Sequence, residues 1–415
     1  MSENDKIKIG GVCFTSEWMQ YQFLNAMLNN DEISEKFALA WVSGKEPNLS
    51  QAEKRMITEI KSKLEELENT IGTPKEWRTK NIIAESKNLF TLLEKAHTNG
   101  TGYVQMNRNA NRFPQSAYDN IDAVAIFTPN VQHLPYFYDS IRFEKPPLIE
   151  KPLAIIQDLE GKADRRSLED LWEINEKAKQ KGVIAMDAEH YSSKVAAKVF
   201  FDQVDQMVLD YGKITKVQGY ILEKDNPKKP RTKALLSKKN QTGLLLDTGV
   251  HLSSMITGIG GKYKDITHAH YAIHSDYDVE TTAHVNLQAY GDYFQGNVPV
   301  TFEVAKFIDL YKKPLDQEKK QVKFTFEKEG KQTTAIVNFK TGEVTSSDGL
   351  KWHKIPHKHH KLEYVNVLNE FYDCIRNNKQ PRTSVDHSIT GLDALCRTYE
   401  NFPVEKNLKE LYVTN

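Results

Sequence analysis

A change in the pattern of elements near residue 214 most constrains how this 415-residue chain folds. Before that point, short apolar runs alternate with helical patterns, and after it strand-like runs follow one another directly. Alternating strands and helices predict a parallel sheet, whereas consecutive strands predict a mostly antiparallel one. The chain also exceeds the length of about 250–300 residues at which single hydrophobic cores stop growing. We therefore expect an α/β protein of two domains, each built on its own sheet.

The first half contains short apolar runs that are typical of buried strands. These runs are Lys6–Val12, Phe37–Val42, Ile121–Phe127, Leu148–Ile149 and Val183–Ala188. Helical patterns separate several of them, since Thr15 or Ser16 can cap a helix that continues to Leu28, and one apolar stripe runs through Ser167–Lys181. The order of strand, helix and strand favours a parallel sheet.

A long charged stretch follows the second predicted strand. Within it, apolar residues recur at helical spacing between Gln51 and Ile71, and a second helix is expected over Ile82–His97. We interpret residues from about 45 to 118 as a helical insertion. It either covers a cleft, packs against another subunit, or forms a solvated helix pair.

The second half contains five predicted strands and two closing helices. The strands are Ile214–Leu222, Val279–Ala289, Val298–Phe307, Val322–Phe326 and Thr333–Phe339. An apolar stripe from Tyr364 to Ile375 predicts one helix, and Asp386–Tyr399 predicts the other. This half is therefore expected to be an α+β domain.

The overall charge and composition exclude several classes of function. The chain carries 56 basic and 56 acidic residues, so it has no global attraction to nucleic acid or to anionic membranes. No run approaches the roughly 18 apolar residues of a membrane span, and the N-terminus lacks a signal-peptide pattern. The three cysteines are too few and too scattered for a disulfide framework. We expect a cytoplasmic protein.

Four short motifs, in order along the chain, resemble the Gfo/Idh/MocA family of glucose-fructose oxidoreductase and inositol dehydrogenase relatives. They are Asp122–His133, Glu150–Ala154, Gly243–His251 and Glu370–Ser384. The resemblance implies a Rossmann-like dinucleotide-binding domain at residues 1–188. It further implies a substrate-binding and oligomerisation domain at 189–415 with a large, mostly antiparallel open sheet. A homo-oligomer and nicotinamide-dependent chemistry on a small sugar or polyol are expected with it.

Two of these motifs follow predicted strands of the first sheet. Thr128, Pro129 and Asn130 come after one strand, and Glu150 and Lys151 end the next. Ligands of open α/β sheets bind at the carboxyl ends of the strands. We therefore predict that all five residues contact a cofactor. A partly desolvated lysine here has a lowered pKa and can shuttle a proton, while the plain alternative is a surface lysine on a turn.

Asp247 and His251 lie four residues apart, which places them near one another on a helix. A carboxylate there can orient an imidazole, which then accepts a hydroxyl proton. The simpler reading is a helix cap and a packed histidine. The family resemblance assigns Lys151, Asp247 and His251 to catalysis.

Three further residues are assigned more loosely. His190 and Tyr191 follow a predicted strand and would face the same cleft, so we predict that they contact substrate. His133 follows the Asn130 turn and is predicted to contact the cofactor, although a histidine on a helix surface fits the pattern as well.

The dinucleotide fingerprint is missing after the first strand. Cys13, Thr15 and Trp18 stand where family members carry the three glycines of G-x-G-x-x-G. Glu17 places a carboxylate near the expected pyrophosphate. The hydroxyls of Thr15 and Ser16 are predicted to replace part of the lost backbone contact; otherwise the cofactor site is lost.

The second strand lacks the terminal acid that holds the ribose of NAD. Ser43 and Lys45 stand there instead and could accept a 2′-phosphate, which favours NADP over NAD. Lys45 as an ordinary loop residue is the alternative.

No histidine group in the sequence makes a recognised metal motif, and we assign no metal. His268 and His270 would nevertheless share one face of a strand, which is the spacing of a ligand pair. The His357, His359 and His360 group is interpreted as a solvated loop that could meet a phosphate.

The sequence thus predicts an NAD(P)-dependent oxidoreductase that moves hydride at a carbinol carbon. Two alternatives stay open. One is a degenerate relative that binds a ligand or partner without redox turnover. The other is a redox-neutral lyase, hydrolase or epimerase that holds a nicotinamide permanently.

Overall fold

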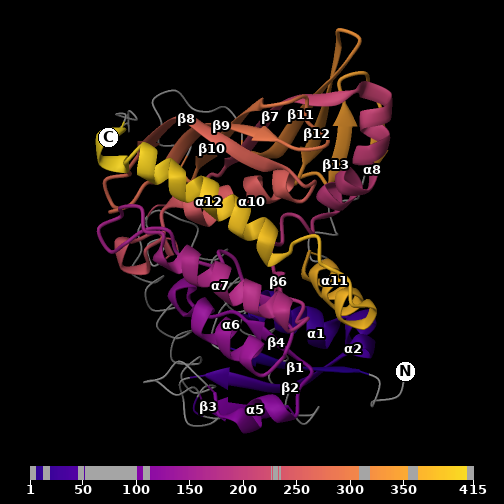
Figure 1. The fold of residues 1–415 in the computed structure, drawn as a ribbon, viewed down its shortest axis with the longest axis vertical. Coiled ribbons are helices and arrows are strands. Elements are labelled where there is room, and N and C mark those ends of the chain that lie inside the picture. The colour runs from indigo at the N-terminus through magenta and orange to yellow at the C-terminus, as the bar shows by residue number, and fades with distance from the viewer. Residues whose placement is uncertain are drawn as a thin grey trace, which may run out of the picture.

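A computed structural model describes most of the chain (Figure 1). The described residues are 6–12, 19–44, 51, 101–105, 113–225, 227, 232, 235–307, 318–353 and 363–408. Most of the predicted insertion, the turn at 13–18, Lys45 and the histidines at 357–360 lie outside these ranges. Within them, no helix is both long and apolar enough to cross a membrane.

The first sheet has six parallel strands in the order β3-β2-β1-β4-β5-β6. Their bounds are β1 Ile7–Val12, β2 Phe37–Gly44, β3 Gly102–Gln105, β4 Ala123–Ile126, β5 Pro147–Ile149 and β6 Met186–Asp187. The strand order reverses direction beside β1 and β4, which is where ligands bind in doubly wound sheets. The predicted parallel, Rossmann-like sheet is confirmed.

Helices cover both faces of this sheet. Alternate side chains of β4 separate the two cores: Val124 and Ile126 join one, and Ala123 and Ala125 join the other. The first core packs against α5 Gln115–Asp119, α6 His133–Arg142 and α7 Arg166–Gln180. The second packs against α1 Asn25–Asn29, α2 Asp31–Lys36 and α11 Glu363–Asn377. Between β1 and α1 the chain forms a π-helix at Met19–Leu24.

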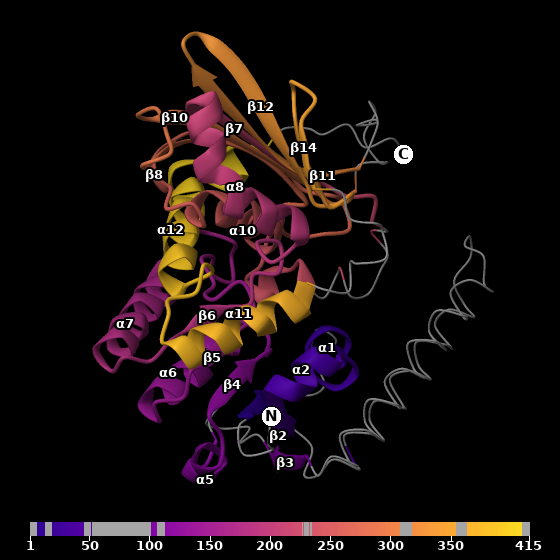
Figure 2. The same ribbon diagram turned by 90° about the vertical axis from the view of Figure 1, so that its right-hand side faces the viewer.

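The helix α11 comes late in the sequence but completes the core of the first sheet. Its buried face, including Leu368 and Phe371, shares a cluster with Ile9 and Phe37. The rings of Phe371 and Phe37 stack at 6.5 Å, and Lys36 donates to Asn369 at 2.7 Å. Both views place α11 beside α1 and α2 (Figures 1 and 2). The division into two domains at residue 188 stays a prediction. Helix α11 comes after that residue in the sequence but packs against the first sheet.

The second sheet has eight strands in the order β14-β13-β12-β11-β7-β10-β9-β8. Their bounds are β7 Lys213–Leu222, β8 Lys262–Ala272, β9 Thr282–Tyr290, β10 Val298–Ala305, β11 Lys319–Lys328, β12 Lys331–Asn338, β13 Glu343–Ser346 and β14 Lys351–His353. Only β7 and β10 pair in parallel, and the other neighbours are antiparallel. The predicted large, mostly antiparallel sheet is confirmed.

Three helices pack against one face of this second sheet, namely α8 Val195–Tyr211, α10 Leu244–Thr257 and α12 Val385–Asn401. Buried and more exposed residues alternate along the strands, as expected for a sheet covered on one face, and the buried apolar residues point toward the helices. On β10, for example, Val300 and Phe302 are buried, whereas Thr301 and Glu303 on the outer face are half-buried. We call the face turned away from α8, α10 and α12 the outer face.

A glycine in β1 is required by packing between strands. A Cβ atom on Gly10 would lie 2.3 Å from a ring carbon of Trp41. The two residues are paired in register on β1 and β2, and the Trp41 indole donates to the Ala117 carbonyl at 2.8 Å. The absence of a side chain at Gly10 therefore leaves room for the Trp41 indole on the neighbouring strand.

Candidate functional site

Lys151 and Asp247 form a buried ion pair between the two sheets. Lys151 lies just after β5, and Asp247 lies in the first turn of α10. The ammonium donates to the Asp247 carboxylate at 2.8 Å and to its main-chain carbonyl at 2.7 Å. Within the described part of the chain, two of the three ammonium protons are therefore committed, and one is left for a ligand.

The charge state of Lys151 differs from the sequence prediction. Burial opposes the charged form, but the carboxylates of Asp247 and Glu150 outweigh it and raise the pKa of Lys151. Burial likewise opposes ionisation of Asp247, and the nearby ammonium still lowers the pKa of that carboxyl. The lowered lysine pKa that we predicted is wrong, because full desolvation came with paired carboxylates. Lys151 is suited to polarise an oxygen as a permanent cation.

His251 has a different partner from the one we predicted. Its Nδ1 lies 2.7 and 2.8 Å from the two oxygens of Glu189, whereas Asp247 is bonded to Lys151. Asp247 as the orienting residue of His251 is therefore wrong. Glu189 follows β6, so it reaches the site from the edge of the first sheet. The sequence signal that could have found it is an acid next to His190 at a strand end.

The remaining nitrogen of His251 is the one available for chemistry. Because Nδ1 faces a carboxylate, it carries the proton and Nε2 keeps its lone pair. Burial and the Lys151 charge hold the pKa of His251 well below its usual range. Burial raises the pKa of Glu189 to about 7, against the pull of Lys151. Near neutral pH the imidazole is therefore an uncharged base.

Aromatic rings pack closely around this imidazole. The Tyr191 ring stacks on it at 4.2 Å and 17°, and the His190 ring meets it edge-on at 4.8 Å. All three side chains are buried. The Lys194 ammonium lies 4.6 Å from the Tyr191 ring centre and forms an ion pair with Glu363 of α11. The structure thus brings His190 and Tyr191 to His251, as the sequence predicted, and their contact with substrate stays a prediction.

A second carboxyl lies beneath the lysine. Glu150 accepts a hydrogen bond of 2.5 Å from the Tyr364 hydroxyl of α11. Burial raises its pKa to about 8, although the Lys151 charge works in the opposite direction. Glu150 is 6% exposed, so its carboxyl belongs to the buried surroundings of Lys151.

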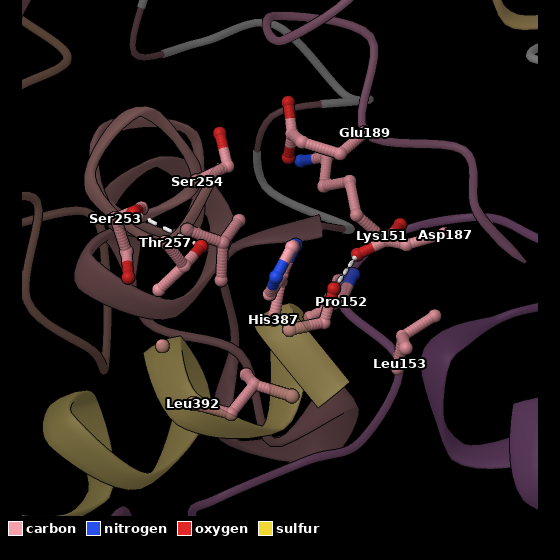
Figure 3. A pocket seen from close by; sticks show the side chains of 13 residues that line it. Lys151, Pro152, Leu153, Asp187, Glu189, Ser253, Ser254, Thr257, His387 and Leu392 are labelled. Atoms are coloured by element: carbon pink, nitrogen blue, oxygen red, sulfur yellow. Dashed lines mark hydrogen bonds between the residues drawn. The ribbon is translucent and has the colours of Figure 1, made fainter. Parts of the chain in front are cut away.

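A small cavity lies beside Lys151. It is lined by residues at the carboxyl edge of the first sheet and by residues of α10 and α12: Lys151, Pro152, Leu153, Asp187, Glu189, Val250, Ser253, Ser254, Thr257, His387, Ser388, Gly391 and Leu392. Figure 3 shows Lys151, Asp187 and Glu189 on one side of it and the α10 residues Ser253, Ser254 and Thr257 on the other. The Ser388 hydroxyl donates to Asp187 at 2.5 Å. The cavity therefore joins the strand edge to the second domain.

The carboxyl edge of β4 offers a polar group for a cofactor. The hydroxyl of Thr128 is buried and, among the described residues, makes no hydrogen bond. Asn130 is half-buried and donates to the Thr242 hydroxyl at 3.1 Å, while Pro129 is exposed. An unsatisfied hydroxyl at the topological switch point fits a ligand with polar edges, such as a nicotinamide dinucleotide. The predicted contacts Thr15, Ser16 and Lys45 lie outside the described residues.

Two predicted cofactor contacts are buried in the structure. His133 is fully buried, and its ring nitrogens lie 2.8 Å from the carbonyls of Thr128 and Pro152. Burial lowers its pKa to about 4, so the neutral ring has one N–H and donates to only one of these two carbonyls. Ser43 is fully buried because β2 continues through Gly44 instead of ending at Val42. Both side chains are buried, and their contact with a cofactor stays a prediction.

Comparison with known proteins gives matches by structure only. No family model matches the chain, and no curated protein matches it. A solved structure of KijD10, a 3-ketoreductase from Actinomadura kijaniata in complex with NADP and TDP-benzene, superposes with a TM-score of 0.62 at 13% identity. That match covers 99% of this chain and 100% of the other. The chain has the fold of these enzymes.

Two further solved structures match over most of both chains. UDP-N-acetylglucosamine 3-dehydrogenase GnnA from Acidithiobacillus ferrooxidans matches with a TM-score of 0.61 at 12% identity, over 98% of this chain and 99% of that one. The WlbA dehydrogenase from Bordetella pertussis, in complex with NADH and UDP-GlcNAcA, matches with a TM-score of 0.61 at 12% identity. That match covers 96% of this chain and 95% of the other. The matched structures are thus a 3-ketoreductase bound to NADP and TDP-benzene, a UDP-N-acetylglucosamine 3-dehydrogenase, and a dehydrogenase bound to NADH and UDP-GlcNAcA.

Proposed function

We propose that this protein is an NAD(P)-dependent oxidoreductase of the Gfo/Idh/MocA type that acts on a sugar or polyol-like substrate. The observation that carries the proposal is the meeting of two buried pairs, Lys151 with Asp247 and His251 with Glu189. The proximity of the two pairs is supported by the influence of the Lys151 charge on the pKa of both Glu189 and His251. The fold shared with the three enzymes supports the same class of reaction.

The residues divide the work at one substrate oxygen. Lys151, held as a cation by Asp247, donates its free N–H to the carbinol oxygen and stabilises negative charge there. His251 accepts the hydroxyl proton at Nε2, and Glu189 stabilises the imidazolium that forms. In the reverse direction the same proton returns to the oxygen. Because all four side chains are buried, these charges act in a low dielectric.

The dinucleotide would lie against Thr128, Pro129, Asn130, Glu150 and Lys151, and when bound it supplies the hydride acceptor or donor. The buried His133 ring donates to one of the Thr128 and Pro152 carbonyls and so helps to keep this edge in place. Thr15, Ser16 and Lys45 remain predicted contacts to its phosphates, with NADP favoured over NAD. His190 and Tyr191 would contact the sugar ring.

The test is turnover of a panel of sugars, polyols and sugar nucleotides, followed by NAD(P)H absorbance. Lys151→Ala and His251→Ala should each lower kcat by about 10²–10⁴-fold. Lys145→Ala, at a half-buried lysine beyond α6, is the matched lysine control and should retain wild-type rates. Unchanged turnover in both site variants would refute the proposed roles.

The altered fingerprint favours a second candidate, a relative that binds its ligand without redox turnover. Cys13, Thr15 and Trp18 replace three glycines, which weakens the expected pyrophosphate contact. Fluorescence titration with NADH and NADPH separates the two candidates. Micromolar binding of either cofactor supports the oxidoreductase. If neither cofactor binds, the second candidate is supported. A nicotinamide that copurifies with the protein and does not exchange would instead indicate a redox-neutral enzyme.

A further inference from the structure

Three histidines gather on the outer face of the eight-stranded sheet, away from the proposed reaction site. His268 and His270 alternate on β8 with Ala269 and Tyr271, which are buried against the helices. The two histidines therefore project on the outer face. Their Nε2 atoms are in direct contact, and the rings are perpendicular with centroids 3.7 Å apart. Two imidazole nitrogens thus converge on one point.

A third imidazole lies directly across the ladder. His284 of β9 pairs in register with His270, and the two rings lie 6.1 Å apart and 27° from parallel. On its other side His284 pairs in register with Glu303 of β10, and its Nδ1 lies 3.5 Å from that carboxylate. A carboxylate at Nδ1 leaves Nε2 as the nitrogen available to a metal.

We propose that His268, His270 and His284 form a binding site for zinc or a similar divalent transition-metal ion. Imidazole is a preferred ligand of such ions, at about 2.0–2.1 Å. Two nitrogens on one tetrahedral ion lie roughly 3.3 Å apart, so a small separation of His268 and His270 would admit it. His284 is about one-third exposed, with 38% of its side chain accessible, and has room to turn toward the pair.

The resulting site has three protein ligands and one open position. Glu303 serves as the outer carboxylate that fixes the His284 ring, in the manner of carboxylate–histidine–zinc triads. Water or a group from another molecule completes the tetrahedron. Strands hold all the ligands, which keeps the geometry rigid.

The outer-face site is independent of the other histidine cluster. Glu189, His190 and His251 also offer ligand atoms within 4.8 Å of one another, but they belong to the proposed reaction site beside the Lys151 cation. That cluster lies on the helix side of the sheet and is present unchanged in every variant below. Any metal bound there adds equally to all measurements.

The experiment is equilibrium dialysis of metal-free full-length protein against micromolar Zn²⁺, with Co²⁺ absorbance as a probe of tetrahedral geometry. H268Q, H270Q and H284Q should each weaken binding at this site by at least about tenfold, and E303Q by less. H274Q is the matched control, since His274 lies beyond the end of β8 and should bind like wild type. Zinc should raise the Tm of wild type and H274Q by more than it raises the Tm of H270Q.

Two results would overturn the proposal. One is wild-type protein that binds no more zinc or cobalt than H270Q does. The other is an H284Q variant that keeps wild-type affinity while H268Q and H270Q lose it, because the site would then lack its third ligand. H268Q and H270Q are two independent variants on β8, so a folding defect in one of them would not by itself be taken for the loss of a ligand.

Discussion

At the scale of single residues, each basic group of the proposed site has its own carboxylate. Asp247 serves Lys151, and Glu189 serves His251. This separation lets the lysine stay charged while the histidine stays neutral. A single carboxylate close to both groups would favour the charged form of each, so it would not keep the lysine charged and the histidine neutral at once.

The separation predicts a pattern of energetic coupling. Asp247→Asn combined with Lys151→Ala, and Glu189→Gln combined with His251→Ala, should each lower kcat/KM by much less than the product of the single effects. Asp247→Asn combined with Glu189→Gln should come closer to that product. Steady-state kinetics of the four single and three double variants checks this. Strong coupling between Asp247 and Glu189 would contradict the pairing.

Glu150 predicts a pH-dependent stability. Its pKa is about 8 in the fold, above the ordinary 4.5, so the folded state holds a proton that the unfolded chain releases. Wild-type stability should therefore fall as pH rises from about 5 to 8, by up to about 1.4 kcal/mol per pH unit. Glu150→Gln has no such proton to lose and should gain in Tm over wild type as pH rises.

Thermal unfolding between pH 5 and 9 measures this difference. Glu173→Gln, on the exposed face of α7, is the matched control and should track wild type at every pH. A difference between Glu150→Gln and wild type that does not change with pH would contradict the expected direction.

The residues that the sequence located are those carried by motifs. Lys151, Asp247 and His251 do meet, although their catalytic roles stay predictions. Glu189 escaped because its role depends on the spacing between β6 and α10, which no local pattern encodes. The burial of Ser43 and His133 was not foreseen, because no local pattern tells a buried polar residue near a strand end from an exposed one.

At the scale of elements, Gly10 and Trp41 predict a packing test. Gly10→Ala places a methyl group 2.3 Å from the indole, so it should destabilise the fold by about 1–3 kcal/mol. Trp41→Phe removes the atoms that clash. The double variant should therefore be more stable than the sum of the two single effects predicts.

Urea unfolding midpoints provide the measurement. Lys8→Ala is the control on the same strand, because Lys8 is exposed and should shift the midpoint little. Additive effects of Gly10→Ala and Trp41→Phe would mean that the glycine is needed for another reason.

The elements found from sequence were the strongly periodic ones. Strands β7, β9, β10, β11 and β12 and helices α7, α11 and α12 match their predicted ranges to within a few residues. Helix α8 and strand β8 were missed. The α8 sequence carries apolar residues on several sides, which obscures its period, and β8 alternates charged and half-buried residues at the sheet edge. Such elements take their form from the sheet they pack against.

At the scale of the whole molecule, the outer face predicts self-association. Within the described residues, helices cover only one face of the eight-stranded sheet. The resemblance to the oxidoreductase family led us to expect a homo-oligomer, and this face is the surface we assign to it. Light scattering should give a multiple of the 47.6 kDa chain mass. Thr301→Arg, in the middle of β10 on this face, should lower that mass.

Gln332→Arg is the matched control, because it adds the same charge at the exposed end of β12. A monomeric wild type would contradict the prediction, as would a Thr301→Arg variant with an unchanged mass.

The position of α11 in the first core has a consequence for synthesis on the ribosome. A growing chain exposes β1, β2 and β4 early, yet the helix that covers Ile9 and Phe37 is made only near the end of the sequence, at Glu363–Asn377. The nascent N-terminal half therefore carries an uncovered apolar surface through most of translation, and chaperones that bind such surfaces should engage it. A chain that stops before residue 363 should remain in that state permanently.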